Sequence, residues 1–220
     1  MADGNHDLKR GIILDVDGTL WDAVEVITQS WNVVLNTMPD VQGEISADQM
    51  RGCLGKTMFE IADRLFGYLP LPRRRQVLEE AMRYEVAYLR EHPGRIYPGV
   101  RECLKALRED GWHLYIVSNC QKGYIEDCLL ALGEEGLVED HICFEDTLQD
   151  KGSNIRLCAE RNQLDYAVYV GDTAQDLSAA RAAGTACSYA GYGFGDVDAA
   201  KERVPEILRF EDLVQAVKEL

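Results

Sequence analysis

The sequence lacks any long apolar run, since no stretch approaches the roughly 18 consecutive apolar residues that a membrane-spanning helix needs. The segment Met1 to Arg10 is polar and contains no apolar signal core. Basic residues are also scarce: 23 lysines and arginines stand against 38 aspartates and glutamates, for a formal net charge of -15. A charge of this sign argues against general binding to nucleic acid or to an anionic membrane. We therefore expect a cytoplasmic protein in which an anionic ligand needs a local basic pocket.

Cysteines and histidines at metal-ligand spacing are missing as well. The seven cysteines are scattered, odd in number and never spaced as Cys-x-x-Cys, and the four histidines show no ligand spacing. Isolated cysteines usually behave as small apolar residues, so we expect reduced and mostly buried thiols at positions 53, 103, 120, 128, 143, 158 and 187. These absences argue against a disulfide framework and against a metal centre built from thiolates or imidazoles.

Most of the chain alternates apolar strand patterns with helical patterns. The periodicity predicts helices at 99–109, 122–132, 152–162 and 174–183, and a final helix ending near Leu220. The apolar runs between them predict strands at 11–16, 114–117, 142–144, 167–170, 186–189 and 207–210. Strands joined by helices through short connections form parallel sheets that are covered by helices on both faces. The predicted fold class is therefore α/β, with a Rossmann-like parallel sheet.

The block from 21 to 93 has a different pattern, because its apolar residues recur at helical spacing and no convincing strand is present. Ser46 is placed to cap a short helix. A long helix is expected from about Arg74 to Glu91, with its charged residues outside its apolar stripe. We therefore expect a Rossmann-like core domain formed by 1–20 and 94–220, with an inserted α-helical domain at 21–93.

The end of the first predicted strand carries the motif Asp15-Val16-Asp17-Gly18-Thr19. In open parallel sheets the carboxyl ends of the strands face the ligand crevice, and a period of two places Asp15 and Asp17 on one face. Two carboxylates there suggest a bound cation, or a nucleophile beside an acid that protonates a leaving oxygen and then activates water. The alternative is a turn that merely closes a strand, although burying an Asp pair for that purpose wastes desolvation energy.

Three further places with reactive groups follow later strands. Ser118 and Asn119 offer a hydroxyl and an amide that suit a phosphate oxygen, although this pair is also common in turns. Lys151 precedes a helix and would offset repulsion between a carboxylate and a phosphoryl group, unless it is a solvated surface charge. Asp172 offers a hard oxygen ligand of the kind that Mg²⁺ prefers, and Asp176 could orient the site, with helix capping as the alternative for both.

Together these motifs resemble those of the haloacid dehalogenase superfamily of hydrolases, from Asp15 to about Gly193. The Asp15-x-Asp17-Gly18-Thr19 segment is similar to the nucleophile motif of that family, and Gly171-Asp172-x-x-x-Asp176 is similar to its acidic motif. The resemblance implies that Mg²⁺ is bound by the Asp15 side chain, the Asp17 backbone carbonyl and the Asp172 side chain. It thereby corrects the idea that both early carboxylates bind metal. It also implies phosphate binding around Gly18, Thr19, Ser118, Asn119 and Lys151.

The same resemblance makes 21–93 a helical cap that closes over the active site and chooses the substrate. Arg51 and Lys56 are candidates to face the substrate from this cap, with exposed surface charges as the alternative. A P-loop at 51–57 is excluded, because Met50 stands where that motif needs glycine and no strand precedes it. The glycine-rich segment 191–195 looks more like the phosphoglycolate phosphatase branch of the family than like the beta-phosphoglucomutases.

The sequence therefore predicts a Mg²⁺-dependent phosphatase that hydrolyses a small phosphorylated metabolite, phosphoglycolate-like or a sugar phosphate, through an aspartyl-phosphate. Asp15, Asp17 and Lys151 form the predicted catalytic set. One alternative is a sugar phosphomutase of the beta-phosphoglucomutase type, which would use the same core residues. Another is a non-catalytic phospho-switch module like a response-regulator receiver. We expect a monomer or weak dimer with no nucleic-acid or membrane partner.

Overall fold

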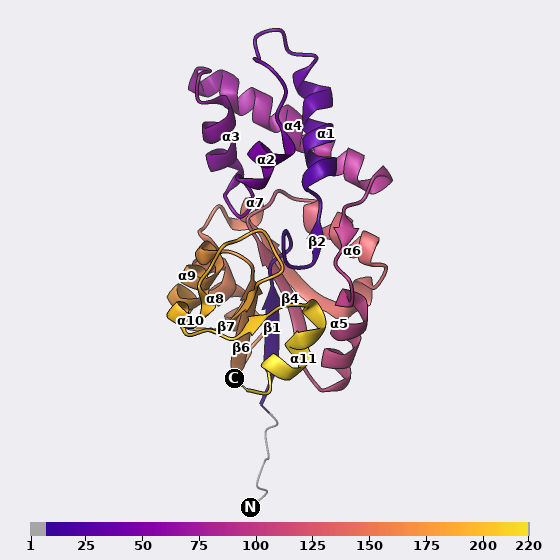
Figure 1. The fold of residues 1–220 in the computed structure, drawn as a ribbon, viewed down its shortest axis with the longest axis vertical. Coiled ribbons are helices and arrows are strands. Elements are labelled where there is room, and N and C mark those ends of the chain that lie inside the picture. The colour runs from indigo at the N-terminus through magenta and orange to yellow at the C-terminus, as the bar shows by residue number, and fades with distance from the viewer. Residues whose placement is uncertain (1–7, 220) are drawn as a thin grey trace, which may run out of the picture.

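The computed structural model describes residues 8–219, in which a six-stranded parallel sheet lies between layers of helices (Figure 1). The strands follow the order β5-β4-β1-β6-β7-β8, and each neighbouring pair is parallel. Their bounds are β1 Arg10–Leu14, β4 His113–Ser118, β5 Val138–Cys143, β6 Tyr166–Gly171, β7 Ala186–Ala190 and β8 Glu206–Ile207. This sheet confirms the predicted α/β class with a Rossmann-like core.

Alternate residues of β1 face the two halves of the hydrophobic core. Ile12 and Leu14 pack in one cluster with α5, α6 and α11, whereas Ile13 packs in the other with α8 and α9. Since both faces of the strand are covered, its apolar run is continuous, as in other buried parallel strands. The helices around the sheet are α5 Val100–Glu109, α6 Tyr124–Leu132, α7 Phe144–Thr147, α8 Lys151–Arg161, α9 Ala174–Ala183, α10 Ala199–Glu202 and α11 Leu213–Ala216.

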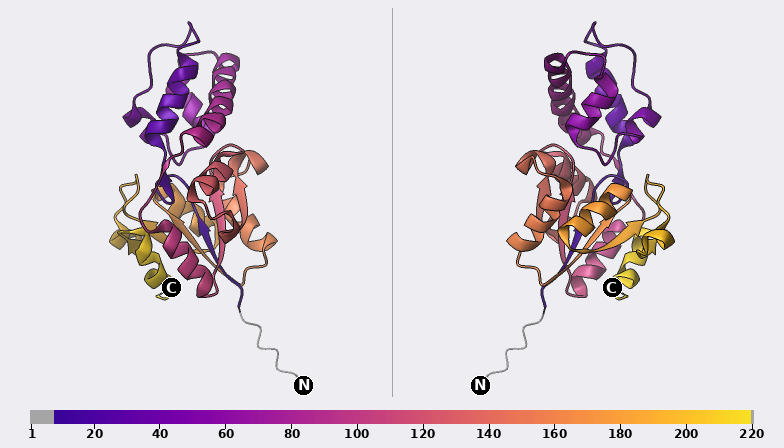
Figure 2. Two further views of the ribbon diagram at one scale, coloured as in Figure 1. Left: turned by 90° about the vertical axis from the view of Figure 1, so that its right-hand side faces the viewer. Right: turned by 90° about the vertical axis from the view of Figure 1, so that its left-hand side faces the viewer.

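A separate group of helices lies beyond the carboxyl ends of the strands. Both views of Figure 2 show it at one end of the molecule. We call it the helical segment; it contains α1 Val24–Leu35, α2 Ala47–Arg51, α3 Met58–Phe66 and α4 Leu71–Glu91. The predicted cap at Ser46 is confirmed, because Ser46 and Gln49 form a reciprocal capping box at the start of α2. The rings of Trp31 and Phe66 stack with centroids 6.1 Å apart and help to join α1 to α3.

The chain enters and leaves the helical segment through a short antiparallel ribbon. This ribbon pairs β2 (Trp21–Asp22) with β3 (Arg95–Ile96). The expectation that 21–93 contains no strand is therefore wrong at its first two residues. A strand of two residues shows no periodicity, and its partner lies far away in the sequence, so the pattern of side chains could not reveal it.

Predicted strands at the two edges of the sheet have different bounds in the structure. β5 begins at Val138 and not at 142, because Glu139, Asp140 and His141 are polar residues on an edge strand and so interrupt the apolar pattern. The strand expected at 207–210 is shorter, and a 3₁₀ turn at Phe210–Asp212 follows it. The final helix, α11, ends at Ala216, and Leu220 lies outside the described residues. No helix within residues 8–219 has the length and apolar character required to cross a bilayer.

Candidate active site

Three neighbouring strands of the sheet end at one place. Asp15 directly follows β1, Ser118 is the last residue of β4, and Asp172 directly follows β6. Strand β1 lies between β4 and β6, and the Asp15 backbone N–H donates to the Val170 carbonyl at 2.9 Å. The parallel order of the strands therefore brings together side chains that are far apart in the sequence.

Lys151 is the buried cation of this place. It is the first residue of α8 and is only 6% exposed, and its Nζ donates to Asp176 Oδ1 at 2.7 Å. The same Nζ lies 3.1 Å from Asp15 Oδ1. Burial opposes the charged ammonium, but the carboxylates of Asp15 and Asp176 outweigh that effect and raise the pKa of Lys151. The alternative of a solvated surface charge is therefore wrong for this residue.

Asp176 holds Lys151 because both of its carboxylate oxygens are fixed. Oδ1 accepts from Lys151, while Oδ2 accepts from Thr173 N at 2.9 Å and from Thr173 Oγ1 at 2.6 Å. Thr173 Oγ1 in turn accepts from Asp176 N, which completes a capping box at the start of α9. The orienting and capping interpretations of Asp176 therefore describe the same geometry.

Asp172 is held by a loop and does not cap a helix. The N-cap of α9 is Thr173, so the capping alternative is wrong for Asp172. Its Oδ2 accepts from the Phe194 backbone N–H at 2.7 Å, within the glycine-rich segment 191–195. Burial is the main reason that the pKa of Asp172 lies well above its usual range. A buried carboxylate of this kind gains stability when a cation binds beside it.

The turn after the first motif is formed by Gly18 and Thr19. Gly18 has a φ of +76°, and a Cβ there would collide with Asp172 Oδ2, so the turn requires glycine. Thr19 is 0% exposed, and its Oγ1 has no hydrogen-bond partner among residues 8–219. Its carbonyl accepts from Tyr192 Oη at 2.8 Å, which ties the turn to the segment 191–195. The contact of Gly18 and Thr19 with phosphate stays a prediction.

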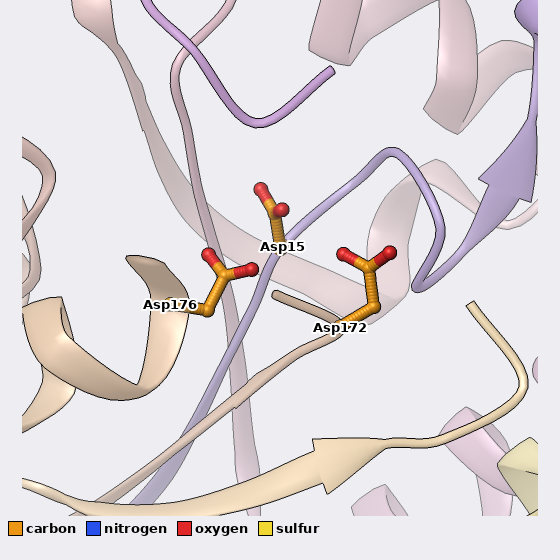
Figure 3. Close-up of side chains that lie close together, drawn as sticks. All are labelled: Asp15, Asp172 and Asp176. Atoms are coloured by element: carbon orange, nitrogen blue, oxygen red, sulfur yellow. The ribbon is translucent and has the colours of Figure 1, made fainter. Parts of the chain in front are cut away.

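The carboxylates of Asp15, Asp172 and Asp176 lie next to one another in Figure 3 and are directed to the same side, and each offers an oxygen within 4.8 Å of the others. Asp15 Oδ1 is buried, and its charged partner in the described part of the chain is the Lys151 ammonium. Burial raises the pKa of Asp15 to about 6, even though Lys151 lowers it. Three buried carboxylates beside one ammonium leave negative charge that a hard divalent cation would balance. The donor set therefore fits Mg²⁺, and Asp15 and Asp172 are better placed to ligate it than Asp176, whose oxygens are fixed.

The Asp17 side chain is directed elsewhere and is not part of this carboxylate cluster. Strand β1 ends at Leu14, so the period of two does not extend to residue 17. Asp17 Oδ1 accepts from Tyr124 Oη at 2.6 Å. Burial raises the pKa of Asp17 to about 7, although the Tyr124 hydroxyl stabilises the ionised form and lowers it. A carboxyl with such a pKa can both give and take a proton near neutral pH.

A pocket opens between the sheet and the helical segment. Asp15, Asp17 and Ser118 line it from the sheet side, and the cavity has a volume of about 30 Å³ in this closed arrangement. Asn119 also lines it, but its Nδ2 donates to the Gly55 carbonyl at 2.9 Å and so connects the sheet side to the helical segment. The structure brings Ser118 and Asn119 to the pocket, and their contact with phosphate stays a prediction.

The two basic candidates of the helical segment differ in position. Lys56 lines the pocket. Arg51 does not: its Nη1 lies 3.3 Å from Asp48 Oδ1, and its guanidinium carbon lies 6.0 Å from the centroid of the Phe194 ring. Of the two, Lys56 is therefore the one that the fold places beside the site.

Sequence reasoning missed three polar residues of the pocket: Glu85, Gln121 and Tyr124. For Glu85 a signal was present. Together with Leu78, Ala81 and Leu89 it belongs to the buried face of α4, so a carboxylate stands inside the apolar stripe. The expectation that every charged residue of this helix lies outside the stripe is therefore wrong. Tyr124 and Gln121 carried no comparable pattern, because their partners come from distant parts of the chain.

The sequence of the chain is similar to those of known hydrolases. The model of the family described as haloacid dehalogenase-like hydrolase matches residues 12–190. A phosphoglycolate phosphatase from Nitrosospira multiformis is 29% identical over 197 residues, which cover 85% of this chain and 85% of the relative. A 5'-nucleotidase from Pseudomonas aeruginosa is 24% identical over 208 residues, with 88% of each chain covered.

A solved structure gives the same picture for the fold. A predicted phosphoglycolate phosphatase from Haemophilus somnus superposes with a TM-score of 0.80 at 21% identity, over 95% of this chain and 98% of that one. At this level of identity the likeness shows the fold alone. The overall fold of the chain is thus shared with that protein.

Proposed function

Because the chain belongs to the haloacid dehalogenase-like hydrolase family, we propose that it is a Mg²⁺-dependent phosphatase of small phosphorylated metabolites. The observation that carries this proposal is that two carboxyl groups of the pocket, Asp15 and Asp17, have different surroundings. Asp15 lies beside Lys151 and the other carboxylates, whereas Asp17 is bonded to Tyr124 and titrates with a pKa of about 7. One carboxyl is therefore placed for nucleophilic attack and the other for proton transfer.

In the proposed reaction, a carboxylate oxygen of Asp15 attacks phosphorus while the bond to the leaving alcohol breaks. Protonated Asp17 gives its proton to the leaving oxygen. The alcohol departs, and the phosphoryl group stays on Asp15 as an aspartyl-phosphate. Ionised Asp17 then takes a proton from water, which attacks the phosphorus and releases inorganic phosphate and free Asp15. Each carboxyl thus returns to its starting protonation state.

Positive charge supports the transfer. The ammonium of Lys151 lies 3.1 Å from Asp15 Oδ1 and would stabilise charge on the phosphoryl oxygens, with the Ser118 hydroxyl as a neutral donor. The side chains of Asp15 and Asp172 and the carbonyl of Asp17 would hold Mg²⁺. When bound, this ion reduces repulsion between the attacking carboxylate and the anionic substrate.

We propose that 21–93 acts as a cap domain over a core formed by 1–20 and 94–220. The contacts that hold the helical segment against the core include three polar ones: Asn119 to Gly55, Gln121 to Glu85, and Arg90 to Asp127. The last pair has an N–O distance of 3.0 Å, and its Asp127 side chain is only 3% exposed. A pocket enclosed in this way excludes water, which favours transfer to Asp15 over side reactions.

The test is phosphate release from a panel that includes phosphoglycolate, sugar phosphates and nucleoside monophosphates. We expect release from at least one ester in the presence of Mg²⁺ and loss of that release when the ion is chelated. Absence of release from every ester would refute the proposal. The panel also reports on substrate choice, for which the names of relatives offer phosphoglycolate and 5'-nucleotides as starting points.

The fold does not separate the mutase alternative from a phosphatase. A beta-phosphoglucomutase from Clostridium difficile superposes with a TM-score of 0.77 at 15% identity, over 96% of each chain, which shows the shared fold alone. Isomerisation of a sugar phosphate without release of phosphate would establish that alternative. Membership of a hydrolase family counts against the phospho-switch alternative. A cytoplasmic location and a monomeric or weakly dimeric state remain predictions.

A further inference from the structure

Glu85 is a buried carboxylate that the proposed reaction does not use. It lies on α4 with 2% exposure, and it lines the same pocket as Asp15 and Asp17. Its Oε1 accepts from Gln121 Nε2 at 2.8 Å, and its Oε2 accepts from Trp31 Nε1. Both donors are neutral, so no cation in these contacts balances the charge of Glu85.

The charge of Glu85 lies in a mostly apolar part of the pocket. The wall that the helical segment contributes to the pocket is mostly apolar, with Ile27, Met50, Met58 and Ile61. Among the described lining residues, Lys56 is the only basic one, and it is half-buried where Glu85 is fully buried. Coulomb interactions are strong in such a poorly solvated place, for attraction and repulsion alike. The charge of a ligand group near Glu85 therefore decides whether it binds.

We propose that Glu85 selects phosphate esters whose leaving alcohol carries an ammonium group, and that it rejects esters whose leaving alcohol carries a carboxylate. This inference rests on the proposed phosphatase function and names its substrate class, a small amino-alcohol phosphate with an apolar body. The phosphoryl group lies at Asp15, and the distal ammonium binds Glu85.

Three observations support this assignment. A carboxylate accepts about four hydrogen bonds, and the two neutral donors leave capacity for a ligand. Burial raises the pKa of Glu85 to about 7 in spite of these donors, so the ionised form lacks a counter-charge. Asp15 already pairs with Lys151, and Asp17 is protonated when the ester binds in the proposed reaction, so Glu85 is the lining carboxylate left for a leaving group with positive charge.

A structural role would explain the same contacts differently. Gln121 follows β4, whereas Glu85 and Trp31 belong to the helical segment, so Glu85 also links the two parts of the chain. A linking role predicts that loss of the carboxylate weakens the hydrolysis of every ester by the same factor. Selection by charge predicts factors of opposite direction for ammonium and carboxylate esters.

The experiment compares Glu85→Gln with the parent on matched phosphate esters. The esters are ω-aminoalkyl, ω-hydroxyalkyl and ω-carboxyalkyl phosphates of increasing chain length, assayed with Mg²⁺ by phosphate release. We expect the parent to prefer the amino series, and Glu85→Gln to lower the amino-to-hydroxy ratio of kcat/KM by about 10- to 100-fold. The carboxy-to-hydroxy ratio should rise. Ratios on one preparation do not depend on the fraction of folded enzyme.

Glu80→Gln is the matched control, because it makes the same substitution on the exposed face of α4 and should leave both ratios unchanged. The proposal is overturned if the parent prefers the carboxy series, or if Glu85→Gln changes all three series by one common factor. Hydrolysis of other phosphate esters with unchanged ratios would overturn this inference and leave the phosphatase proposal intact. Failure to hydrolyse any phosphate ester would overturn both.

Discussion

Asp15 and Glu85 are buried to the same degree, at 2% exposure each, yet they are balanced in different ways. Asp15, at the carboxyl edge of the sheet, has the Lys151 ammonium 3.1 Å away and two further carboxylates nearby. Glu85, in the helical segment, has only the neutral donors of Trp31 and Gln121. The carboxylates of the sheet edge are therefore partly balanced by an ammonium of the chain, whereas Glu85 of the helical segment has no cation of the chain beside it in these contacts.

The largest effect is expected at Asp15, the proposed nucleophile at the sheet edge. Asp15→Asn keeps the shape of the side chain but removes the nucleophile, so turnover should fall by at least about 10⁴-fold. Phosphate release under saturating ester and Mg²⁺ measures it. A variant that hydrolyses a good ester as fast as the parent would contradict the assignment of Asp15.

Lys151→Met tests the balance of charge at the sheet edge. Because Asp15 and Asp176 would both lose their buried cation, the free energy of unfolding should fall by about 3 to 5 kcal/mol at neutral pH. The pKa of Asp15, already raised to about 6, should rise further, so the loss becomes smaller as the pH falls and the carboxylate protonates. Urea unfolding between pH 5 and 8, a range that includes the pKa of Asp15, measures the loss of stability at neutral pH and its decrease at lower pH.

Lys122→Met is the control for that experiment. Its Nζ lies 3.6 Å from Asp146 Oδ1, with 63% of the Lys122 side chain exposed, so water screens the pair. The unfolding free energy should change by less than about 1 kcal/mol. Equal losses of unfolding free energy in the two variants would mean that burial does not make the ion pairs of Lys151 more stabilising than the exposed pair of Lys122.

Tyr124→Phe removes the hydrogen bond that stabilises ionised Asp17. The pKa of Asp17, about 7 with this bond present, should rise by about one to two units, because hydrogen bonds to charged groups contribute about 1.5 to 3 kcal/mol. Protonated Asp17 is the form that serves the leaving alcohol, so the high-pH limb of kcat/KM should move to higher pH. Tyr84→Phe is the control, because the Tyr84 side chain lies on the exposed face of α4. An identical pH profile in both variants would count against Asp17 as the acid.

The smallest effects are expected at the basic residues of the helical segment. Lys56→Ala should change KM by about 3- to 10-fold, because Lys56 lines the pocket. Arg51→Ala should change it by less than about twofold, since Arg51 pairs with Asp48 outside the pocket. Steady-state kinetics on one ester decides between them, and a larger effect at Arg51 would reverse the order proposed here.

The sheet and its reactive edge could be predicted because short local patterns determine them. Apolar runs followed by Asp15, Ser118 and Asp172 locate strand ends, and parallel order then brings those ends together. Lys151 was also identified, but its burial was not, because a lone lysine before a helix has no pattern that distinguishes a buried cation from a solvated one. That distinction depends on Asp15 and Asp176, which reach it from other elements.

The helical segment could be predicted in its helices but not in its contacts. Periodicity identified α4 as amphipathic, yet it treated Glu85 as one more exterior charge. The partners of Glu85 come from α1 and from the loop after β4, and no spacing in the sequence connects these three places. The sequence did not predict the ribbon of β2 and β3 for the same reason: the two strands are far apart in the sequence, and only two residues of each pair.

The contact between Gln121 and Glu85 also bears on how the pocket would open. Gln121 belongs to the core and Glu85 to the helical segment, so any separation of the two parts breaks their 2.8 Å bond and lets water reach the carboxylate. Hydration stabilises an ionised carboxylate that has no counter-ion, so separation of the two parts would cost less free energy while Glu85 has no cationic partner. A ligand with positive charge removes that advantage. Under the proposed selection, the closed arrangement would be favoured most when the bound ligand places an ammonium group beside Glu85.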